Sequence, residues 1–284
     1  MQLQTQLPTA IPVELSEEFL KRVPYLSEGL GKVSVMPGGQ KIEFEMMTGF
    51  EGQHEVVAAR LSELAEKLCI NYRPGSTRCV AKRSKLPSEY RVDPHPELEA
   101  RGDILRYGRG RYGLGPRMVR LIDFFEIRAK EMAQAFEAGA HTFPSLIGAD
   151  VLDTCRYLKN FPASLNLVSH LREDHAVLQE FAQSVKWNGD QMEYNRDGAS
   201  GVECLLSPSV CFHWYRWLRG TKLEKPVAVT ALGKCFRYES SNLTGLERLW
   251  DFAMREIILV GPSDYVLTNR DRLVQMCALY LDEL

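Results

Sequence analysis

The chain has 284 residues, is 45% hydrophobic and 25% charged, and carries a formal net charge of −2. This composition leaves enough apolar residues for a core, so it excludes a mainly disordered chain. The near balance of charge argues against a general nucleic-acid binder, and the length suggests one large domain or two smaller ones.

The sequence carries no sign of membrane insertion or secretion. No apolar stretch approaches the roughly 18 residues that a membrane helix needs, and the first residues lack the basic and apolar regions of a secretory signal. We therefore expect no membrane association and a cytoplasmic location. The seven cysteines are odd in number and scattered, which indicates reduced thiols, some of them possible metal ligands.

The first 75 residues predict a small α+β module. Residues 1–12 are polar and contain proline, which indicates a mobile arm. Residues 31–48 predict two strands around a Pro-Gly-Gly turn, and apolar residues at helical spacing predict a helix over 52–69.

The next segment, residues 76–110, is predicted to be a basic linker. Residues 71–117 contain 11 Lys or Arg, 5 Asp or Glu and 5 prolines. Such a segment is a solvated linker or a site for an acidic partner. The run Gly108–Gly113 matches a dinucleotide-binding pattern, but without a preceding strand and a following helix it is weak support for that function.

The remaining residues, 111–284, predict helices packed on an antiparallel sheet. An amphipathic helix is expected over 117–138, ended by Gly139, and Pro144 in the extended piece that follows suits a sheet edge or an interface. Further helices and strands are expected in the order of the chain, so the fold class is α+β. The expected helices are 149–158, 174–185 and 272–284, and the expected strands are 202–206, 227–232, 234–239 and 254–260.

The most informative segment runs from Gly233 to Gly261. Arg237 and Glu239 are two residues apart on a predicted strand, so they share one face, and Phe252 and Glu256 share a face of the next strand. An Arg can bind a phosphate, an aromatic ring can stack on a base, and carboxylates can hold an amino group or a metal. The residues therefore favour a nucleotide-and-amine site, while a plain Arg237–Glu239 ion pair is the alternative.

This segment resembles motif 2 of the class II aminoacyl-tRNA synthetases, which reads aromatic-Arg-x-Glu, a loop, then Arg-x-x-x-Phe. The resemblance implies that Arg237 holds the α-phosphate of ATP and stabilises the charge that develops as pyrophosphate leaves. It also implies that Glu239 faces the adenine, that Arg248 reaches the distal phosphate, and that Phe252 stacks on the adenine.

Three further runs resemble the amino acid:[carrier protein] ligases, which are relatives of the zinc-dependent seryl-tRNA synthetases. They are Tyr157–Pro162, Leu206–Cys211 and Phe252–Glu256. The likeness covers roughly residues 108–284 and suggests no family for residues 1–107. The helix 117–138 with the Pro144 piece resembles motif 1 of the class, which implies a homodimer.

The same resemblance implies a zinc site in which Cys211 and Glu256 are two of three ligands. A Cys, Glu, Cys set with one open position is reasonable zinc chemistry, and the open position would take the amino group of the substrate. The alternative for Cys211 is a buried thiol without metal. No residue matches the third ligand, and Cys277 is interpreted as a core thiol.

Motif 3 of the class is not recognisable before Leu284, so we expect a C-terminally incomplete class II core with impaired activity. The resemblance implies activation of a small amino acid by ATP with Mg²⁺ and Zn²⁺, and its transfer to the phosphopantetheine thiol of a carrier protein. The alternatives are a zinc-dependent seryl-tRNA synthetase relative and a non-catalytic paralogue. A tRNA partner is ranked lower because only residues 71–117 are basic.

Overall fold

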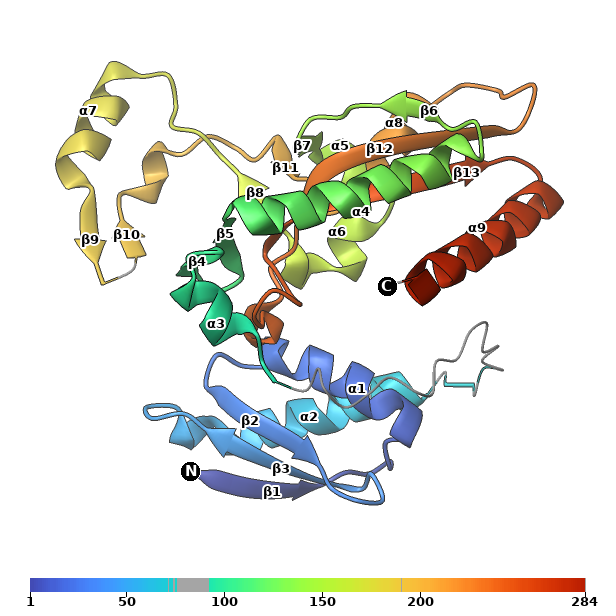
Figure 1. The fold of residues 1–284 in the computed structure, drawn as a ribbon. Coiled ribbons are helices and arrows are strands. Elements are labelled where there is room, and N and C mark those ends of the chain that lie inside the picture. The colour runs from blue at the N-terminus through green and yellow to red at the C-terminus, as the bar shows by residue number, and fades with distance from the viewer. Residues whose placement is uncertain (71, 74, 76–91, 190, 284) are drawn as a thin grey trace. The chain divides into compact units, whose positions relative to one another are not determined.

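The computed structural model describes residues 1–70, 72, 73, 75, 92–189 and 191–283 (Figure 1). The chain divides into two compact units. The first consists of Met1–Lys82 with Glu239–Thr244, and the second of Arg83–Tyr238 with Gly245–Leu284. Within the described residues, no helix has the length and apolar character that a membrane crossing requires.

The first unit is an antiparallel sheet with two helices. The strand order is β1-β3-β2, and the side chains that point to the helices form the core. Ile42, Phe44 and Met46 alternate along β3 and are at most 3% exposed. The elements are β1 (Gln2–Gln6), α1 (Val13–Arg22), β2 (Leu30–Val35), β3 (Lys41–Met46) and α2 (His54–Cys69), with 3-10 turns at Val23–Tyr25, Glu51–Gln53 and Ser240–Asn242.

The expectation of a mobile arm over residues 1–12 is wrong. Residues 2–6 pair with β3 as an edge strand, from Gln2 opposite Glu45 to Gln6 opposite Lys41. Leu7 and Ile11 are 1% and 3% exposed. Alternation of Gln with Leu and Thr lets one face of the strand meet the core while the other meets water, which is typical of an antiparallel sheet.

The second unit contains the remaining described elements, built around two three-stranded sheets with orders β7-β11-β8 and β13-β12-β6. The fold is mixed α+β, as predicted. The helices are α3 (His95–Ala100), α4 (Pro116–Gln134), α5 (Ala149–Thr154), α6 (Tyr157–Asn160), α7 (His175–Ser184), α8 (Cys211–Trp217) and α9 (Ser263–Glu283), with 3-10 turns at Pro162–Ser164 and Arg196–Gly198. The strands are β4 (Ile104–Gly108), β5 (Arg111–Leu114), β6 (Gly139–His141), β7 (Leu146–Gly148), β8 (Leu167–Val168), β9 (Lys186–Asn188), β10 (Gln191–Glu193), β11 (Cys204–Leu206), β12 (Val227–Phe236) and β13 (Asp251–Val260).

Several boundaries differ from the prediction. Residues 76–91 of the expected linker lie outside the described residues, but residues 92–110 are not a linker: they form α3, β4 and the turn into β5. The glycines Gly108 and Gly110 serve a β-hairpin turn with positive φ. Helix α4 ends at Gln134, and the left-handed residue after it is Glu137, not Gly139 as expected. Pro144 lies between β6 and β7.

The long ribbon of β12 and β13 is the centre of the second unit. The two strands pair antiparallel without a break from Val227 opposite Val260 to Phe236 opposite Asp251. The sequence suggested two strands on either side of Gly233, but this glycine lies inside β12 opposite Met254. Figure 1 shows α4 running along this ribbon.

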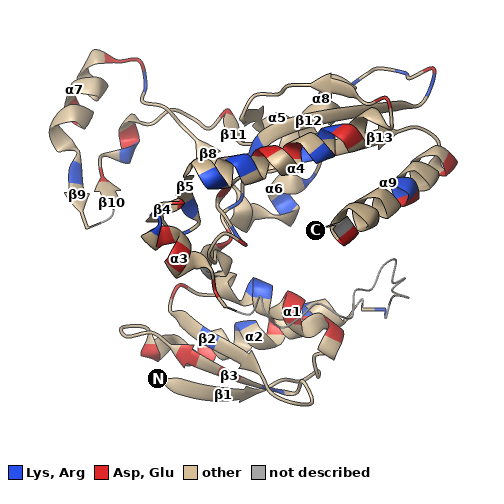
Figure 2. Cartoon of the chain, viewed as in Figure 1, with Lys and Arg blue, Asp and Glu red and all other residues tan. Residues whose placement is uncertain are grey.

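A mostly buried ion pair fastens α4 to the ribbon. The guanidinium of Arg255 donates from Nε to Glu126 Oε2 at 2.7 Å and from Nη2 to Oε1 at 2.5 Å. The side chains of Arg255 and Glu126 are 13% and 15% exposed. Arg255 also donates to Thr230 Oγ1 at 2.9 Å. Charged residues of both signs lie along α4 (Figure 2). Among them, Glu126 ties the helix to β13 through its pair with Arg255.

We expect Glu126→Ala to lower the free energy of unfolding by about 3 kcal/mol, because it leaves Arg255 buried and unpaired. Glu131→Ala is the control: its pair with Arg128 on the same helix is exposed (53% and 41%), so the loss should stay below about 1 kcal/mol. Urea denaturation of the variants measures both values. Equal losses would contradict this account of the Arg255 pair.

The same pair adds a pH dependence. The hydrogen bond from Arg255 lowers the pKa of Glu126 below its ordinary value of 4.5. A depressed carboxyl pKa stabilises the fold at pH values above the unfolded pKa, and that contribution is lost as the pH falls through the folded pKa. The difference between wild type and Glu126→Ala should therefore shrink in acid.

Candidate active site

The register of the β12–β13 ribbon sorts its side chains onto two faces. Cys235 lies opposite Phe252, Gly233 opposite Met254, and Ala231 opposite Glu256. Because paired residues of antiparallel strands share a face and residues two apart along a strand also share a face, these side chains form one surface. Arg237 follows Cys235 by two residues and belongs to the same face. We call this surface the front face of the ribbon.

Arg237 is held by two contacts on the front face. Its Nε donates to the carbonyl of Pro208 at 2.9 Å, and its Cζ lies 5.4 Å from the centroid of the Phe252 ring. The Nε bond fixes the plane of the guanidinium, whose Nη groups carry the remaining N–H donors. Two of the predicted ATP residues, Arg237 and Phe252, are therefore in contact.

Cys211 and Glu256 meet at the hydroxyl of Ser209. Ser209 Oγ donates to Glu256 Oε1 at 2.7 Å and lies 3.2 Å from Cys211 Sγ. Cys211 begins α8, and the segment before it packs on the front face through Val210, which is 2% exposed. The structure thus brings together two residues that are 45 positions apart in the sequence.

The surroundings of Cys211 favour the protonated thiol. Burial raises its pKa, the hydrogen bond with Ser209 lowers it, and the nearby carboxylate of Glu256 raises it. Burial, followed by the charge of Cys211, raises the pKa of Tyr215 to about 12. Burial also raises the pKa of Cys235 to about 11. This is a desolvated group of weak acids around one carboxylate, in which a bound cation would reverse the preference and favour the thiolate.

The donor set fits a metal only in part. Cys211 and Glu256 supply a thiolate and a carboxylate at one point, which suits zinc. Within the described residues, no group of three or more His, Cys, Asp or Glu side chains could hold an ion. Cys277, interpreted as a core thiol, is half-buried on α9 with its Sγ 3.9 Å from the Sδ of Met132.

The other two predicted ATP residues lie in the segment between the strands. Arg248 is exposed, and it precedes β13. Glu239 is half-buried and belongs to the stretch Glu239–Thr244, which is part of the first unit. The roles of all six predicted residues remain predictions.

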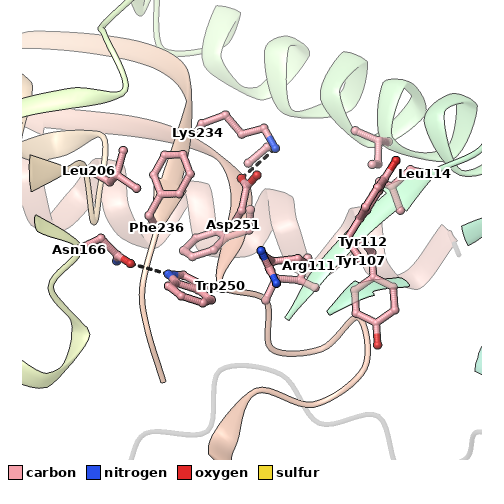
Figure 3. Close-up of a pocket in the computed structure, with 14 residues that line it drawn as sticks. Tyr107, Arg111, Tyr112, Leu114, Asn166, Leu206, Lys234, Phe236, Trp250 and Asp251 are labelled. Atoms are coloured by element: carbon pink, nitrogen blue, oxygen red, sulfur yellow. Dashed lines mark hydrogen bonds and ion pairs between the residues drawn. The ribbon is translucent and has the colours of Figure 1, made fainter. Parts of the chain in front are cut away.

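A cavity of about 910 Å³ lies mainly on the opposite face of the ribbon (Figure 3). Lys234, Phe236 and Asp251 line it, and these alternate with the front-face residues along the strands. Lys234 Nζ pairs with Asp251 Oδ1 at 2.9 Å. Phe252 contributes to the lining, but its contact with Arg237 is on the front face. The cavity and the predicted ATP site therefore share Phe252.

Aromatic side chains and Arg111 form one side of this cavity. Trp250 Nε1 donates to Asn166 Oδ1 at 2.5 Å, and Arg111 lies over the Trp250 ring at 5.8 Å (Figure 3). Tyr107 and Tyr112 of the β4–β5 hairpin complete this side. The cavity could not be predicted from the sequence, because its walls come from segments far apart in the chain.

Sequence reasoning missed Ser209 and Tyr215, which surround the thiol of Cys211. Their nearness to Cys211 in the sequence was the available signal. Two members of the aromatic run after Cys211 pack against the fold: Trp214 is 4% exposed, and His213 stacks on Phe143 at 5.3 Å between ring centroids.

No protein-family model matches the chain, but curated relatives do. A type-2 serine–tRNA ligase of Methanococcus aeolicus is 26% identical over 188 residues, which cover 64% of this chain and 36% of that protein. An amino acid–[acyl-carrier-protein] ligase of Bradyrhizobium diazoefficiens is 26% identical over 193 residues, 66% of this chain and 56% of that protein. The chain therefore spans about a third to just over half of the length of these relatives.

The structure matches the M. kandleri SerRS, solved with A. aeolicus tRNASec, at a TM-score of 0.66 and 17% identity. The match covers 100% of this chain and 55% of that one, so it includes the first unit, for which the sequence suggested no family. At this identity the likeness shows the fold alone. The chain is thus a homologue of the type-2 serine–tRNA ligases and the amino acid–[acyl-carrier-protein] ligases, and it has the mixed α+β fold of a class II seryl-tRNA synthetase.

Proposed function

We propose that the front face of the ribbon binds ATP with Mg²⁺ and activates a small amino acid for transfer to the phosphopantetheine thiol of a carrier protein. The observation that carries the proposal is the placement of Arg237 and Phe252 on the same face as the Cys211–Ser209–Glu256 group. The first pair suits a nucleotide, and the second group suits an amine. The relative from Bradyrhizobium that is named an amino acid–[acyl-carrier-protein] ligase supports the choice of acceptor.

The first step would form the aminoacyl-adenylate. A carboxylate oxygen of the amino acid attacks the α-phosphorus of ATP, the bond to the bridging oxygen breaks, and pyrophosphate leaves with Mg²⁺. Arg237 is placed to stabilise the charge on the α-phosphate, because its guanidinium is already oriented by Pro208. Phe252 offers a ring face for the adenine, while Glu239 and Arg248 would contact the adenine and the distal phosphate.

The second step would transfer the amino acid to sulfur. The thiol of the carrier's phosphopantetheine attacks the carbonyl carbon of the mixed anhydride, the thiol proton is lost, and AMP leaves. The product is a thioester. This step needs an open approach to the front face and no further oxidant or reductant.

Zinc, when bound, would supply a Lewis-acid position for the substrate amino group, held by Cys211 and Glu256. The shared hydroxyl of Ser209 keeps these two donors at one point. Glu256 and Ser209 by themselves offer hydrogen-bond acceptors to an ammonium group.

Amino-acid-dependent exchange of pyrophosphate into ATP tests the first step. We expect exchange with glycine or alanine and a loss of at least about 100-fold in Arg237→Ala, the scale seen when one charge-stabilising donor is removed. Lys222→Ala, on an exposed loop, is the control and should retain the wild-type rate.

Other outcomes of the same measurement assign the alternatives. Exchange with serine would favour the tRNA-ligase relationship, which the Methanococcus relative supports. Retention of labelled tRNA on a filter, lost with rising salt, would then identify the acceptor. A folded chain without any exchange would contradict the proposed activity and favour a non-catalytic paralogue.

We expect the purified chain to bind zinc, and Cys211→Ala to lower the zinc content measured by mass spectrometry after desalting. Cys204→Ala is the matched control, because Cys204 lies on β11, outside the Ser209 group. Zinc content that is unchanged in Cys211→Ala would remove this residue from the proposed site.

We also propose that the chain forms a homodimer through α4, as the resemblance to motif 1 implies. Large apolar side chains on this helix are exposed, among them Phe124 at 40% and Ile127 at 55%. Light scattering should give the mass of a dimer for wild type and of a monomer for Ile127→Glu. A monomeric wild type would contradict the assignment of α4 as the dimer helix.

A further inference from the structure

The chain that leads into β13 is anchored by a histidine from the segment first interpreted as a linker. His95, the first residue of α3, directs its Nε2 to the backbone N–H of Leu246 at 2.7 Å. Its Nδ1 lies 2.6 Å from Asp93 Oδ1, and its own backbone N–H donates to the same oxygen at 3.0 Å. The His95 side chain is only 23% exposed.

These partners determine the tautomer of the ring. A backbone N–H can only donate, so Nε2 of His95 must carry a lone pair. The proton therefore resides on Nδ1 and is donated to the carboxylate of Asp93. The hydrogen bonds from the backbone and then the ring of His95 lower the pKa of Asp93, which keeps that carboxylate charged. The neutral ring is thus the form that can accept from Leu246.

Gly245 makes room for the ring. It has a φ of +46°, and a Cβ at this position would lie 2.5 Å from both Cε1 and Nε2 of His95. A side chain here would displace the imidazole and would also strain the backbone. The glycine and the histidine therefore form a matched pair, with Tyr112 of β5 beside the ring at 6.5 Å between centroids.

A second anchor holds the same stretch four residues later. The backbone N–H of Trp250 donates to the carbonyl of Gly110 at 2.8 Å. Arg248 lies between the two anchors, two residues from each. The backbone around Arg248 is thus fixed at both ends by residues of the region 95–110.

We propose that His95 is a positioning residue for the ATP site: by accepting from Leu246 N–H it sets the path of the backbone that presents Arg248 to the distal phosphate. This inference rests on the proposed function for its link to ATP. The anchor itself is a contact within the second unit and can be measured separately. The carboxylate of Asp93 faces Nδ1 of the ring, and the ring of Tyr112 on β5 lies beside it.

The test compares His95→Gln, which keeps a hydrogen-bond acceptor on a side chain of similar length, with His95→Leu, which removes it. Two quantities are measured at the same pH: hydrogen exchange of the Leu246 amide, and KM for ATP against kcat in pyrophosphate exchange. We expect His95→Leu to raise the amide exchange rate and KM for ATP about tenfold, with kcat nearly unchanged. His95→Gln should stay close to wild type.

Gly245→Ala, which displaces the ring, should behave like His95→Leu and gives a second variant should His95→Leu fail to fold.

Two results would overturn the proposal: unchanged amide protection and KM in both acceptor-free variants, or a His95→Gln variant as impaired as His95→Leu. The failure of the proposed function is distinguishable. If wild type shows no pyrophosphate exchange, the ATP role of His95 is overturned. Protection of the Leu246 amide that is lost in His95→Leu and kept in His95→Gln would still establish the anchor.

Discussion

The antiparallel register of β12 against β13 is the constraint on which the candidate site depends. One residue of slip would move Arg237 relative to Phe252 and Glu256 and turn every side chain of the shifted strand to the opposite face. The uninterrupted pairing from Val227 to Phe236 resists such a slip. The absence of a side chain at Gly233 leaves room for Val210, whose Cγ2 would lie only 3.1 Å from a Cβ at this position.

The two faces of the ribbon have different chemistry because different segments cover them. The front face is covered by the Ser207–Cys211 segment, which brings the thiol of Cys211 and the hydroxyl of Ser209 to Glu256. The rear face is covered by α4, fastened through Arg255, and by the β4–β5 hairpin. Neighbouring residues of β13, Arg255 and Glu256, therefore have unrelated roles: one secures a helix and the other belongs to the polar group of the candidate site.

The electrostatics of the front face favour a cationic occupant. Glu256 is surrounded by Cys211, Tyr215 and Cys235, and burial raises the pKa of each of these. Neutral weak acids beside a carboxylate make a site that gains from a positive charge, whether an ammonium group or a metal ion. Arg237 lies next to Phe252, so in the proposed function the anionic and cationic parts of the substrates would have separate partners on one sheet.

Local pattern was enough to predict much of the fold. The period of apolar residues predicted β3, α2 and α4. Spacing along the predicted strands put Arg237, Phe252 and Glu256 forward as a possible site, and the resemblance to the carrier-protein ligases added Cys211. Long-range pairing was beyond that pattern: β1 read as an arm because a strand with one polar face resembles a coil until its partner β3 is known. Residues 92–110 read as a linker because their order comes from contacts such as that of His95 with Leu246, 151 positions away.

The sequence by itself determined the fold class and which residues of β12 and β13 share a face, since these follow from periodicity and spacing along the chain, although it divided β12 at Gly233. Only the tertiary structure decided that Ser209 joins Cys211 to Glu256, that the large cavity lies on the other face, and that Gly245 leaves room for the ring of His95. The physical reason is that hydrogen bonds and cavities depend on distances between segments far apart in the chain, and local propensity carries no information on those distances.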